Sequence, residues 1–422
     1  MGPPSPVDPH ALGGALPLWS VLPFAGLLLC IALFPLFASR FWARHYGKVS
    51  LAFGLPVAAW FLFAAPATLW HTALEYLSFI VLLGSLFTIS GGILLKGTIR
   101  GTPAVNCVFL GVGAVVANLL GTTGASMLLI RPLLRANAHR ERKSHIVVFF
   151  IFVVANIGGL LTPIGDPPLF LGYLKGVPFF WTVANLWHIW LVTVAMVIGV
   201  FYGMDRQAYL SEGGSGIGPG PEGEGASPLS LEGKGNFLLL GVVIGAVFLP
   251  TPWREIAMVS AAGMSAWKTP GGIHRENRFS YHPIEEVAIL FAGIFATMMP
   301  ALMILSARGG ELGVTRPWHF FWATGTLSSF LDNAPTYLTF FSLAQGLPGS
   351  GDVAGVSGTI LRAISAGAVF MGANSYIGNA PNFMVKAIAE ASGVRMPSFL
   401  GYMMYSAAIL LPMFALITWL FL

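Results

Sequence analysis

Two stretches, FLDNAPT at residues 330–336 and IGNAPNF at residues 377–383, place polar residues, glycine and proline inside apolar surroundings. Related stretches come earlier, LLGTTGAS at residues 119–126 and IGDPPLF at residues 164–170. Pairing Leu120 with Leu331 gives an offset of 211, and pairing Ile164 with Ile377 gives an offset of 213. Motifs that recur in order at a nearly constant offset indicate an internal repeat, although chance recurrence of helix breaks is the alternative.

The composition explains why such breaks matter. Of 422 residues 55% are apolar and only 9% are charged, against roughly 25% charged in an ordinary soluble domain. A water-soluble globule is therefore nearly excluded. The net charge is +5, and the basic residues fall in short clusters between apolar runs, which is typical of membrane topology and not of a nucleic-acid partner. The first 15 residues carry no Lys or Arg, which argues against a cleaved signal peptide.

A membrane span needs about 20 apolar residues. The candidate spans are residues 16–38, 49–70, 76–95, 146–170, 182–203, 237–250, 255–267, 287–305, 361–388 and 399–422, of which 237–250 and 255–267 are short. Residues 206–236 are rich in Gly, Pro, Ser and Glu and are expected to form a flexible cytoplasmic linker. This divides the chain into a first transmembrane repeat, 1–205, and a second, 237–422.

Two segments are too short to cross twice and predict re-entrant hairpins, at residues 103–136 and 317–346. The return arm 127–134 rises only about 12 Å as a helix, which cannot recross about 30 Å of hydrocarbon. Basic residues precede and follow the first hairpin, so both of its ends are expected in the cytoplasm. Each hairpin is followed by a broken helix, at residues 146–172 and 361–391.

Each half then contains five crossings and one hairpin. Because five is odd, the second half is expected to enter the membrane inverted relative to the first, which is the plan of many secondary transporters. Arg40, Arg44 and Lys48 are expected to mark a cytoplasmic loop. The predicted fold class is an all-α polytopic membrane protein with an inverted repeat of about 5+5 transmembrane helices.

Irregular backbone at membrane depth is tolerated only where it is buried in protein or lines a wet cavity. Gly165 and Gly378 permit bends at the broken helices, while Pro167 and Pro381 remove backbone donors, so these four residues are the predicted hinges. The side chains at the four breaks nearly all offer oxygen, which Na⁺ prefers. The predicted ion-binding or substrate-binding residues are Asp332, Asn333, Thr336, Thr122, Thr123, Ser126, Thr162, Asp166, Asn374, Ser375, Asn379 and Asn382.

Asp332, with Asn333, is the first candidate for a Na⁺ ligand, because an ionised carboxylate at a hairpin tip is costly without a partner. The alternative is that it caps the second arm of its hairpin, and the two roles are compatible. Asp166 is a second ligand or a cap for the next half-helix.

Arg131 is expected to reach back to the cytoplasmic interface, and would favour an anionic substrate if it turned inward. The sequence favours solvated loop positions for His139 and His145.

The motifs at residues 162–168, 332–336 and 378–382 resemble those of the ion transporter superfamily, in particular NhaD-type sodium/proton antiporters and bacterial proteins named as citrate transporters. The Asp332-Asn333-x-x-Thr336 pattern is similar to that of the antiporter branch, where the Asp and Asn are implicated in ion binding. The antiporters often carry an Asp-Asn pair at the first hairpin too, whereas this chain has Gly121-Thr122-Thr123. The resemblance implies a homodimer in the bacterial inner membrane that moves both hairpins as an elevator.

The function expected from these observations is secondary active transport, with sodium/proton antiport first and a carrier for citrate or another small anion second. The expected partners are the lipid bilayer and a small ion or carboxylate. No cofactor is expected beyond transported Na⁺ and H⁺. An intramembrane hydrolase using Ser126 is disfavoured, because no histidine stands at a spacing that would make it the base.

Overall fold

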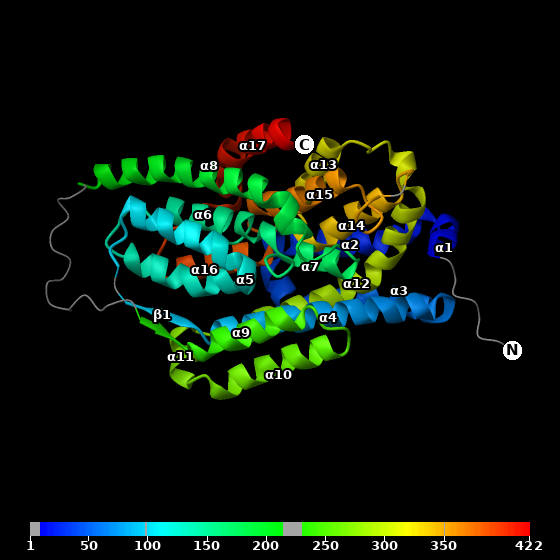
Figure 1. The fold of residues 1–422 in the computed structure, drawn as a ribbon, viewed down its shortest axis with the longest axis horizontal. Coiled ribbons are helices and arrows are strands. Elements are labelled where there is room, and N and C mark those ends of the chain that lie inside the picture. Colours follow the sequence, from blue (N-terminus) through cyan, green and yellow to red (C-terminus); the bar gives the residue numbers. More distant parts are fainter. Residues whose placement is uncertain (1–8, 98, 214–229, 350) are drawn as a thin grey trace.

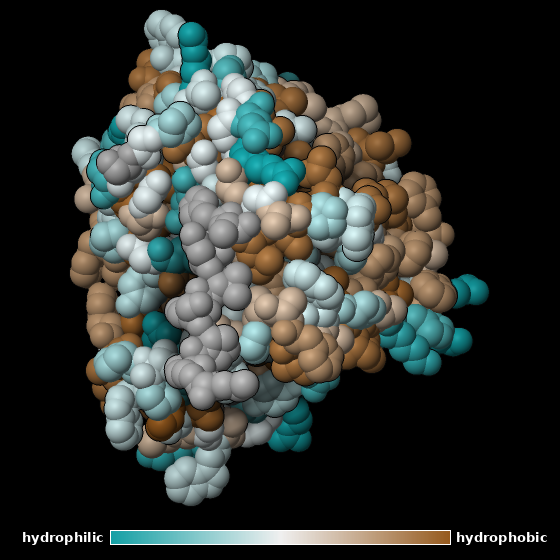
Figure 2. Space-filling model, turned by 90° about the vertical axis from the view of Figure 1, so that its right-hand side faces the viewer, coloured by the Kyte–Doolittle hydropathy of each residue, from teal (hydrophilic) through white to brown (hydrophobic). Residues whose placement is uncertain are grey.

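The computed structural model describes residues 9–97, 99–213, 230–349 and 351–422, and these are almost entirely helical (Figure 1). Eight helices in the described ranges are long and apolar enough to cross a membrane. Large apolar side chains also stay exposed on outer helices, among them Phe63, Trp267 and Trp419. Figure 2 shows one end of the molecule, where apolar residues cover much of the surface. The structure confirms an all-α polytopic membrane protein.

Within the described ranges, the first half supplies eight α-helices. Their bounds are α1 Pro9–Ala15, α2 Leu22–Phe37, α3 Ser39–Ala64, α4 Pro66–Gly91, α5 Pro103–Ala136, α6 Ser144–Val153, α7 Pro167–Leu174 and α8 Trp181–Ser211. The 3₁₀ turn η1 Leu18–Val21 directly precedes α2, and the 3₁₀ turn η2 Ile157–Leu161 lies between α6 and α7. The interruption between α6 and α7 falls within the predicted broken helix.

The second half likewise contains both long helices and interrupted ones. Its α-helices are α9 Gly235–Ala246, α10 Trp253–Lys268, α11 Gly271–Glu276, α12 His282–Arg308, α13 Pro317–Ser328, α14 Asn333–Gln345, α15 Gly358–Met371, α16 Ala380–Ala391 and α17 Phe399–Phe421. The 3₁₀ turns η4 Gly309–Leu312 and η5 Gly372–Asn374 follow α12 and α15. Helices α9 and α10 are 12 and 16 residues long, about 18 and 24 Å, so each is shorter than the hydrocarbon layer.

The helices pack in two groups that meet along α4 and α12. Helix α4 contacts α3, α9, α10 and α12, and α12 contacts α3 (Figure 1). On the other side, α5 packs against α6, α8 and α16, and α13 packs against α14 and α15. Contacts of α4 with α5 and α7, and of α12 with α14, join the two groups. The hairpins and broken helices thus lie against a separate layer of long helices.

Two predictions about the first spans are wrong. Arg40, Arg44 and Lys48 lie in α3 and not in a loop. Their spacing of four positions puts them on one face of a helix, so they do not interrupt it. The predicted span 49–70 straddles the junction of α3 and α4 at Ala65, whose backbone leaves the helical region (φ −151°, ψ 66°) before Pro66 opens the next helix.

The predicted linker is shorter than residues 206–236. Residues 206–211 belong to α8, and α9 begins at Gly235. Strand β2 (Ser230–Glu232) pairs antiparallel with β1 (Leu94–Lys96), and Lys96 makes ion pairs with Glu232 at 3.0 Å and with Glu276 at 2.8 Å. Residues 214–229 of the predicted linker lie outside the described residues. The sequence does not reveal this pairing, because it joins two short segments from opposite halves of the chain.

Helix α5 is not one straight helix, because Gly121 has φ 74° and ψ 157°. A straight helix of 34 residues would hold its ends about 51 Å apart. Instead the Gly101 amide donates to the Ala136 carbonyl oxygen at 2.8 Å, and the Asn106 and Asn137 side chains bond each other at 3.0 and 2.7 Å. The two arms therefore fold back beside each other, and the 34-residue helix is not a single span.

A buried ionic cluster fixes the base of this hairpin. The Asp205 carboxylate in α8 accepts hydrogen bonds from the Arg140 guanidinium and from Asn106 Nδ2, each at 2.9 Å. His145 Nε2 lies 2.8 Å from the same carboxylate. Arg140 Nε also donates to Glu212 at 2.7 Å. The expectation of a solvated His145 is wrong, because only 8% of the residue is exposed and its ring contributes to the shell of a buried carboxylate. The cluster joins α5, α6 and α8 at one end of the molecule.

Replacing Gly121 by Ala should destabilise the protein by about 1–3 kcal/mol, because only glycine readily adopts this combination of φ and ψ. Thermal or denaturant unfolding of the purified protein measures the change. Gly199→Ala is the matched control, since a Cβ at that position in α8 meets no atom within 4 Å. Equal stability of the two variants would mean that the bend at Gly121 does not depend on glycine.

Candidate functional site

The centre of the candidate site is Asp166, which lies between η2 and α7 and is 1% exposed. Its Oδ1 accepts hydrogen bonds from Thr122 Oγ1 at 2.9 Å and from Asn379 Nδ2 at 3.1 Å. Its Oδ2 accepts a hydrogen bond from Asn333 Nδ2 at 2.5 Å. All three donors are neutral, so in the described structure no hydrogen bond from a basic side chain compensates the carboxylate.

The three donors come from three different segments of the chain. Thr122 follows the bend of the first hairpin, Asn333 begins the second arm of the second hairpin, and Asn379 precedes α16 in the second broken helix. The amide of Thr122 also donates to the Gly165 carbonyl oxygen at 2.8 Å. Both hairpin tips therefore bond to one carboxylate deep in the protein, and each of the four sequence motifs contributes one residue to the site.

Two prolines explain why Asp166 is free to bind remote donors. An aspartate before a helix normally caps it by accepting from the amide of the second or third helical residue. Here Pro167 and Pro168 occupy the first two positions of α7, and the amide of Leu169 donates to the Asp166 carbonyl oxygen. The side chain accordingly makes no cap hydrogen bond.

Asp332 behaves differently from Asp166. Its side chain accepts from the Ala334 amide at 3.0 Å and so caps α14, and it remains partly exposed. Thr336 donates to the Asp332 carbonyl oxygen at 2.9 Å, within the same first turn. The structure therefore places Asp332 and Thr336 beside the site, while Asn333 alone of this motif bonds to Asp166. Whether Asp332 itself binds an ion stays a prediction.

Asn156 is a central residue that the sequence analysis does not identify. It is fully buried directly before η2, and its Nδ2 donates to Asn382 Oδ1 at 2.7 Å and to the Ile151 carbonyl oxygen at 2.8 Å. Its Oδ1 accepts from Asn379 Nδ2 at 3.2 Å. It thus orients two residues of the second broken helix. In the sequence, Asn156 stands out as a lone amide side chain inside the apolar run 146–170. It lies outside the glycine and proline motifs that indicate the other site residues.

Equivalent hydrogen bonds recur at the repeat offset. Thr162 Oγ1 donates to the Asn118 carbonyl oxygen at 2.6 Å, and Ser375 Oγ donates to the Ser329 carbonyl oxygen at 2.5 Å. Thr162 and Ser375 share the offset of Ile164 and Ile377, and Asn118 and Ser329 share that of Leu120 and Leu331. In each case the broken helix is tied to the first arm of the preceding hairpin. This correspondence supports the internal repeat.

The remaining predicted residues support the site from further away. Asn382 Nδ2 donates to the carbonyl oxygens of Gly372 at 2.8 Å and Ser375 at 2.9 Å, and Asn374 donates to Ser329 Oγ at 2.9 Å. Thr123 is half-buried and takes no part in the described network. Thr162 and Ser375 therefore bond to backbone oxygens, Asn374 bonds to a side chain, and none of the three bonds to Asp166.

The predicted hinge glycines are required by close packing. A Cβ on Gly165 would overlap the Gly159 carbonyl oxygen, and one on Gly378 would overlap that of Gly372. Neither glycine has a positive φ, so the constraint is steric. Pro167 and Pro381 occupy the first turns of α7 and α16, where a missing amide hydrogen costs little.

The donor set fits a small hard cation. Asn333 Oδ1 and Ser126 Oγ are buried and make no hydrogen bond within the described residues. Asp166, Asn333 and Thr122 meet and offer carboxylate, amide and hydroxyl oxygens, the ligand types that Na⁺ prefers. The described residues include no group of three or more His, Cys, Asp and Glu side chains that could hold a metal ion. A cation here would depend on one carboxylate and several neutral oxygens.

Helices long enough to cross a membrane, with broken segments that converge on one buried acid, define a multi-pass membrane protein of the transporter class. The family described as "Putative citrate transport" matches residues 13–422, and the chain belongs to that family. No curated protein matches the chain. The resemblance to citrate-transporter-like members of the ion transporter superfamily is thereby confirmed, while the specific NhaD likeness stays a prediction.

Asn156→Ala should destabilise the protein by about 1–3 kcal/mol, because it removes partners from the buried amides of Asn379 and Asn382. Unfolding of the purified protein by heat or denaturant measures this cost. Asn185→Ala is the control, since Asn185 in α8 is part-buried and, among the described residues, donates one turn back to the Trp181 carbonyl oxygen. If both variants unfold alike, Asn156 does not organise the site.

Proposed function

We propose that the protein is a secondary active transporter that exchanges Na⁺ for H⁺, with Asp166 as the group that binds the two cations in turn. The observation that carries the proposal is the buried Asp166 carboxylate, held between both hairpin tips by neutral donors alone. A buried carboxylate without a basic partner is stabilised either by a proton or by a metal cation. Competition between these two is the minimal chemistry of antiport.

Asn333 provides a means of exchanging ligands at Asp166. Its Nδ2 now donates to Asp166 Oδ2, while its Oδ1 has no hydrogen-bond partner among the described residues. Rotation of the amide by half a turn would bring Oδ1 toward the carboxylate. There it could coordinate a cation together with Asp166, whereas without a cation or proton the two oxygens would repel each other. The same residue can therefore serve the empty and the loaded state.

In the proposed mechanism the hairpins and broken helices move together as an elevator against the layer that contains α3, α4 and α12. Lys175, just after α7, donates to both oxygens of Glu75 in α4 at 2.7 and 2.8 Å. This ion pair joins the proposed moving group to the proposed scaffold. It would have to break during each transport cycle. The homodimer expected from the resemblance is part of the same proposal.

A second candidate function is cation-coupled transport of citrate. The family description favours it. The amino ends of α14 and α16 begin at the site, and helix amino ends attract carboxylates. In this version the cation at Asp166 would offset its charge, so that an anion could bind next to it. Both candidates place the coupling cation at the same carboxylate.

Asp166→Asn should abolish Na⁺-driven proton flux, because an asparagine takes up no proton and carries no charge to hold Na⁺. The measurement is the response of an internal pH dye in proteoliposomes to an imposed Na⁺ gradient. Asp332→Asn should retain flux, because asparagine can still cap α14. Loss of flux in Asp332→Asn but not in Asp166→Asn would move the cation site to Asp332.

The same preparation allows two controls, one for correct folding of the variants and one for the identity of the substrate. Na⁺ should raise the unfolding temperature of the native protein and not that of Asp166→Asn, because only the native protein binds the ion. The exposed Glu311→Gln variant should behave as the native protein does. Saturable uptake of labelled citrate without Na⁺/H⁺ exchange would replace the first candidate by the second.

Glu75→Gln and Lys175→Met should each change the transport rate about fivefold, because a partly exposed ion pair contributes at most about 1 kcal/mol to the state that contains it. Initial rates in proteoliposomes at saturating substrate measure the effect. The reversed pair, Glu75→Lys with Lys175→Glu, should restore the native rate. Native rates in both single variants would contradict a role for this ion pair in the cycle.

A further inference from the structure

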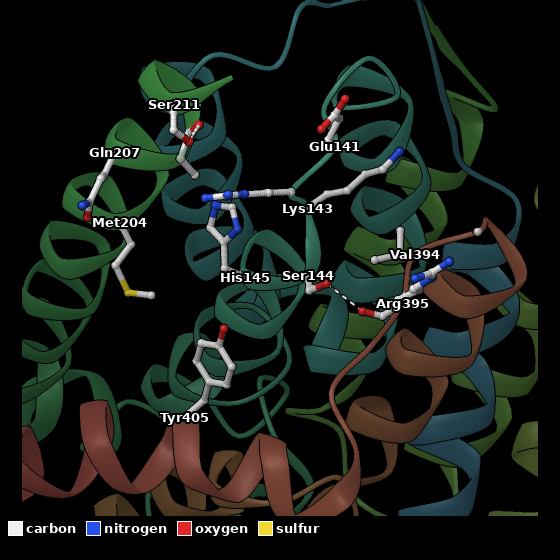
Figure 3. Close-up of a pocket in the computed structure, with 13 residues that line it drawn as sticks. Glu141, Lys143, Ser144, His145, Met204, Gln207, Ser211, Val394, Arg395 and Tyr405 are labelled. Atoms are coloured by element: carbon white, nitrogen blue, oxygen red, sulfur yellow. Dashed lines mark hydrogen bonds between the residues drawn. The ribbon is translucent and has the colours of Figure 1, made fainter. Parts of the chain in front are cut away.

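A cavity of about 780 Å³ opens at the end of the molecule where α6 begins and α8 ends (Figure 3). Its walls come from residues 141–145, the last turns of α8, the loop at residues 393–395 and one residue of α17. It lies at the base of the first hairpin and not at Asp166. The sequence predicts that this end is cytoplasmic, from the basic residues on both sides of the hairpin.

One side of the cavity carries unpaired positive charge. Arg142, Lys143 and Arg395 line it, against a single acid, Glu141. No carboxylate in the described part of the chain forms an ion pair with these three cations. Lys143 Nζ donates to the Ala138 carbonyl oxygen at 3.2 Å, which leaves its other two hydrogens available. The cavity therefore attracts an anion with several acceptor oxygens.

The opposite side of the cavity is apolar. Met204 of α8 and Tyr405 of α17 form this wall, while Val394 lies beside Arg395 (Figure 3). Neighbouring apolar residues on the same helices face outward, with Tyr202 45% exposed and Met404 69% exposed. Apolar surfaces that a membrane would cover therefore lie close to the cavity on both helices. A ligand that is anionic at one end and apolar at the other matches both walls.

The floor of the cavity is tied to the first hairpin. His145 lines the cavity, and its Nε2 lies 2.8 Å from the buried Asp205 carboxylate. The same carboxylate accepts from Asn106 at the start of α5. On the rim, Ser144 donates to the Arg395 carbonyl oxygen at 2.6 Å, which joins α6 to the loop after α16. A ligand in the cavity would bridge elements that belong to both repeats.

We propose that this cavity binds the phosphate headgroup of an anionic phospholipid, with the acyl chains lying along α8 and α17. Basic pockets between membrane helices on the cytoplasmic side are suited to such headgroups, and phosphate supplies the several acceptor oxygens that guanidinium and ammonium groups bind. The site is separate from the transport site and would hold α6, α8 and the loop at 393–395 in one arrangement.

The test compares the native protein with the double variant Arg142→Ala/Arg395→Ala. Native mass spectrometry counts the phosphatidylglycerol and cardiolipin molecules that stay bound to detergent-purified protein, and titration of each lipid gives its affinity. Removing two cations should weaken binding roughly 30-fold, about fivefold for each. Arg275→Ala is the matched control, because Arg275 is exposed in α11 and does not line the cavity. The control should bind lipid as the native protein does.

Further arms separate a lipid from a soluble phosphate. Cardiolipin should raise the unfolding temperature of the native protein and of Arg275→Ala but not of the double variant, while inorganic phosphate and phosphatidylcholine should have no such effect. An equal shift with inorganic phosphate would overturn the lipid assignment in favour of a soluble anion. Equal lipid affinity in the native protein and in the double variant would overturn the proposal altogether.

Discussion

The arrangement of the molecule depends on one buried carboxylate and the donors that satisfy it. An ionised side chain at membrane depth is costly, and Asp166 makes its hydrogen bonds only when Thr122, Asn333 and Asn379 all stand in place. These residues belong to two hairpins and a broken helix, so one group fixes the relative position of segments from both halves of the chain. Breaking any one of these bonds weakens the compensation of the charge, and this is the reason for proposing that a proton or a cation binds there.

Most of the helical architecture could be predicted from the sequence, because its determinants are local. Apolar run length and the glycine and proline breaks located the interrupted segments around Gly121, Gly165 and Gly378. The β1–β2 pairing could not be predicted, because it depends on contacts between distant segments. The prediction for the run containing Arg40, Arg44 and Lys48 is wrong because it gives charge more weight than the spacing of four positions that lets a helix continue.

The site could be predicted as a set of residues but not as a ranking. Four predicted residues, Asp166, Thr122, Asn333 and Asn379, do meet, since motifs that break a helix at membrane depth must satisfy one another. Asn156 is absent from that set because its hydrogen bonds reach Asn379 and Asn382 of the other broken helix, and a contact between such distant segments leaves no local sequence pattern.

The different hydrogen bonding of Asp332 and Asp166 follows from the residues that come after each of them. After Asp332 come Asn333 and Ala334, whose amides are present, and the carboxylate accepts from Ala334 to cap its own helix. After Asp166 come two prolines, which have no amide hydrogen. An acid that its own helix cannot satisfy must find partners elsewhere or stay protonated, and at membrane depth water is no alternative. Asn379 precedes Ala380 and Pro381 and likewise makes no cap hydrogen bond, so both broken helices free a polar side chain for the centre by the same means.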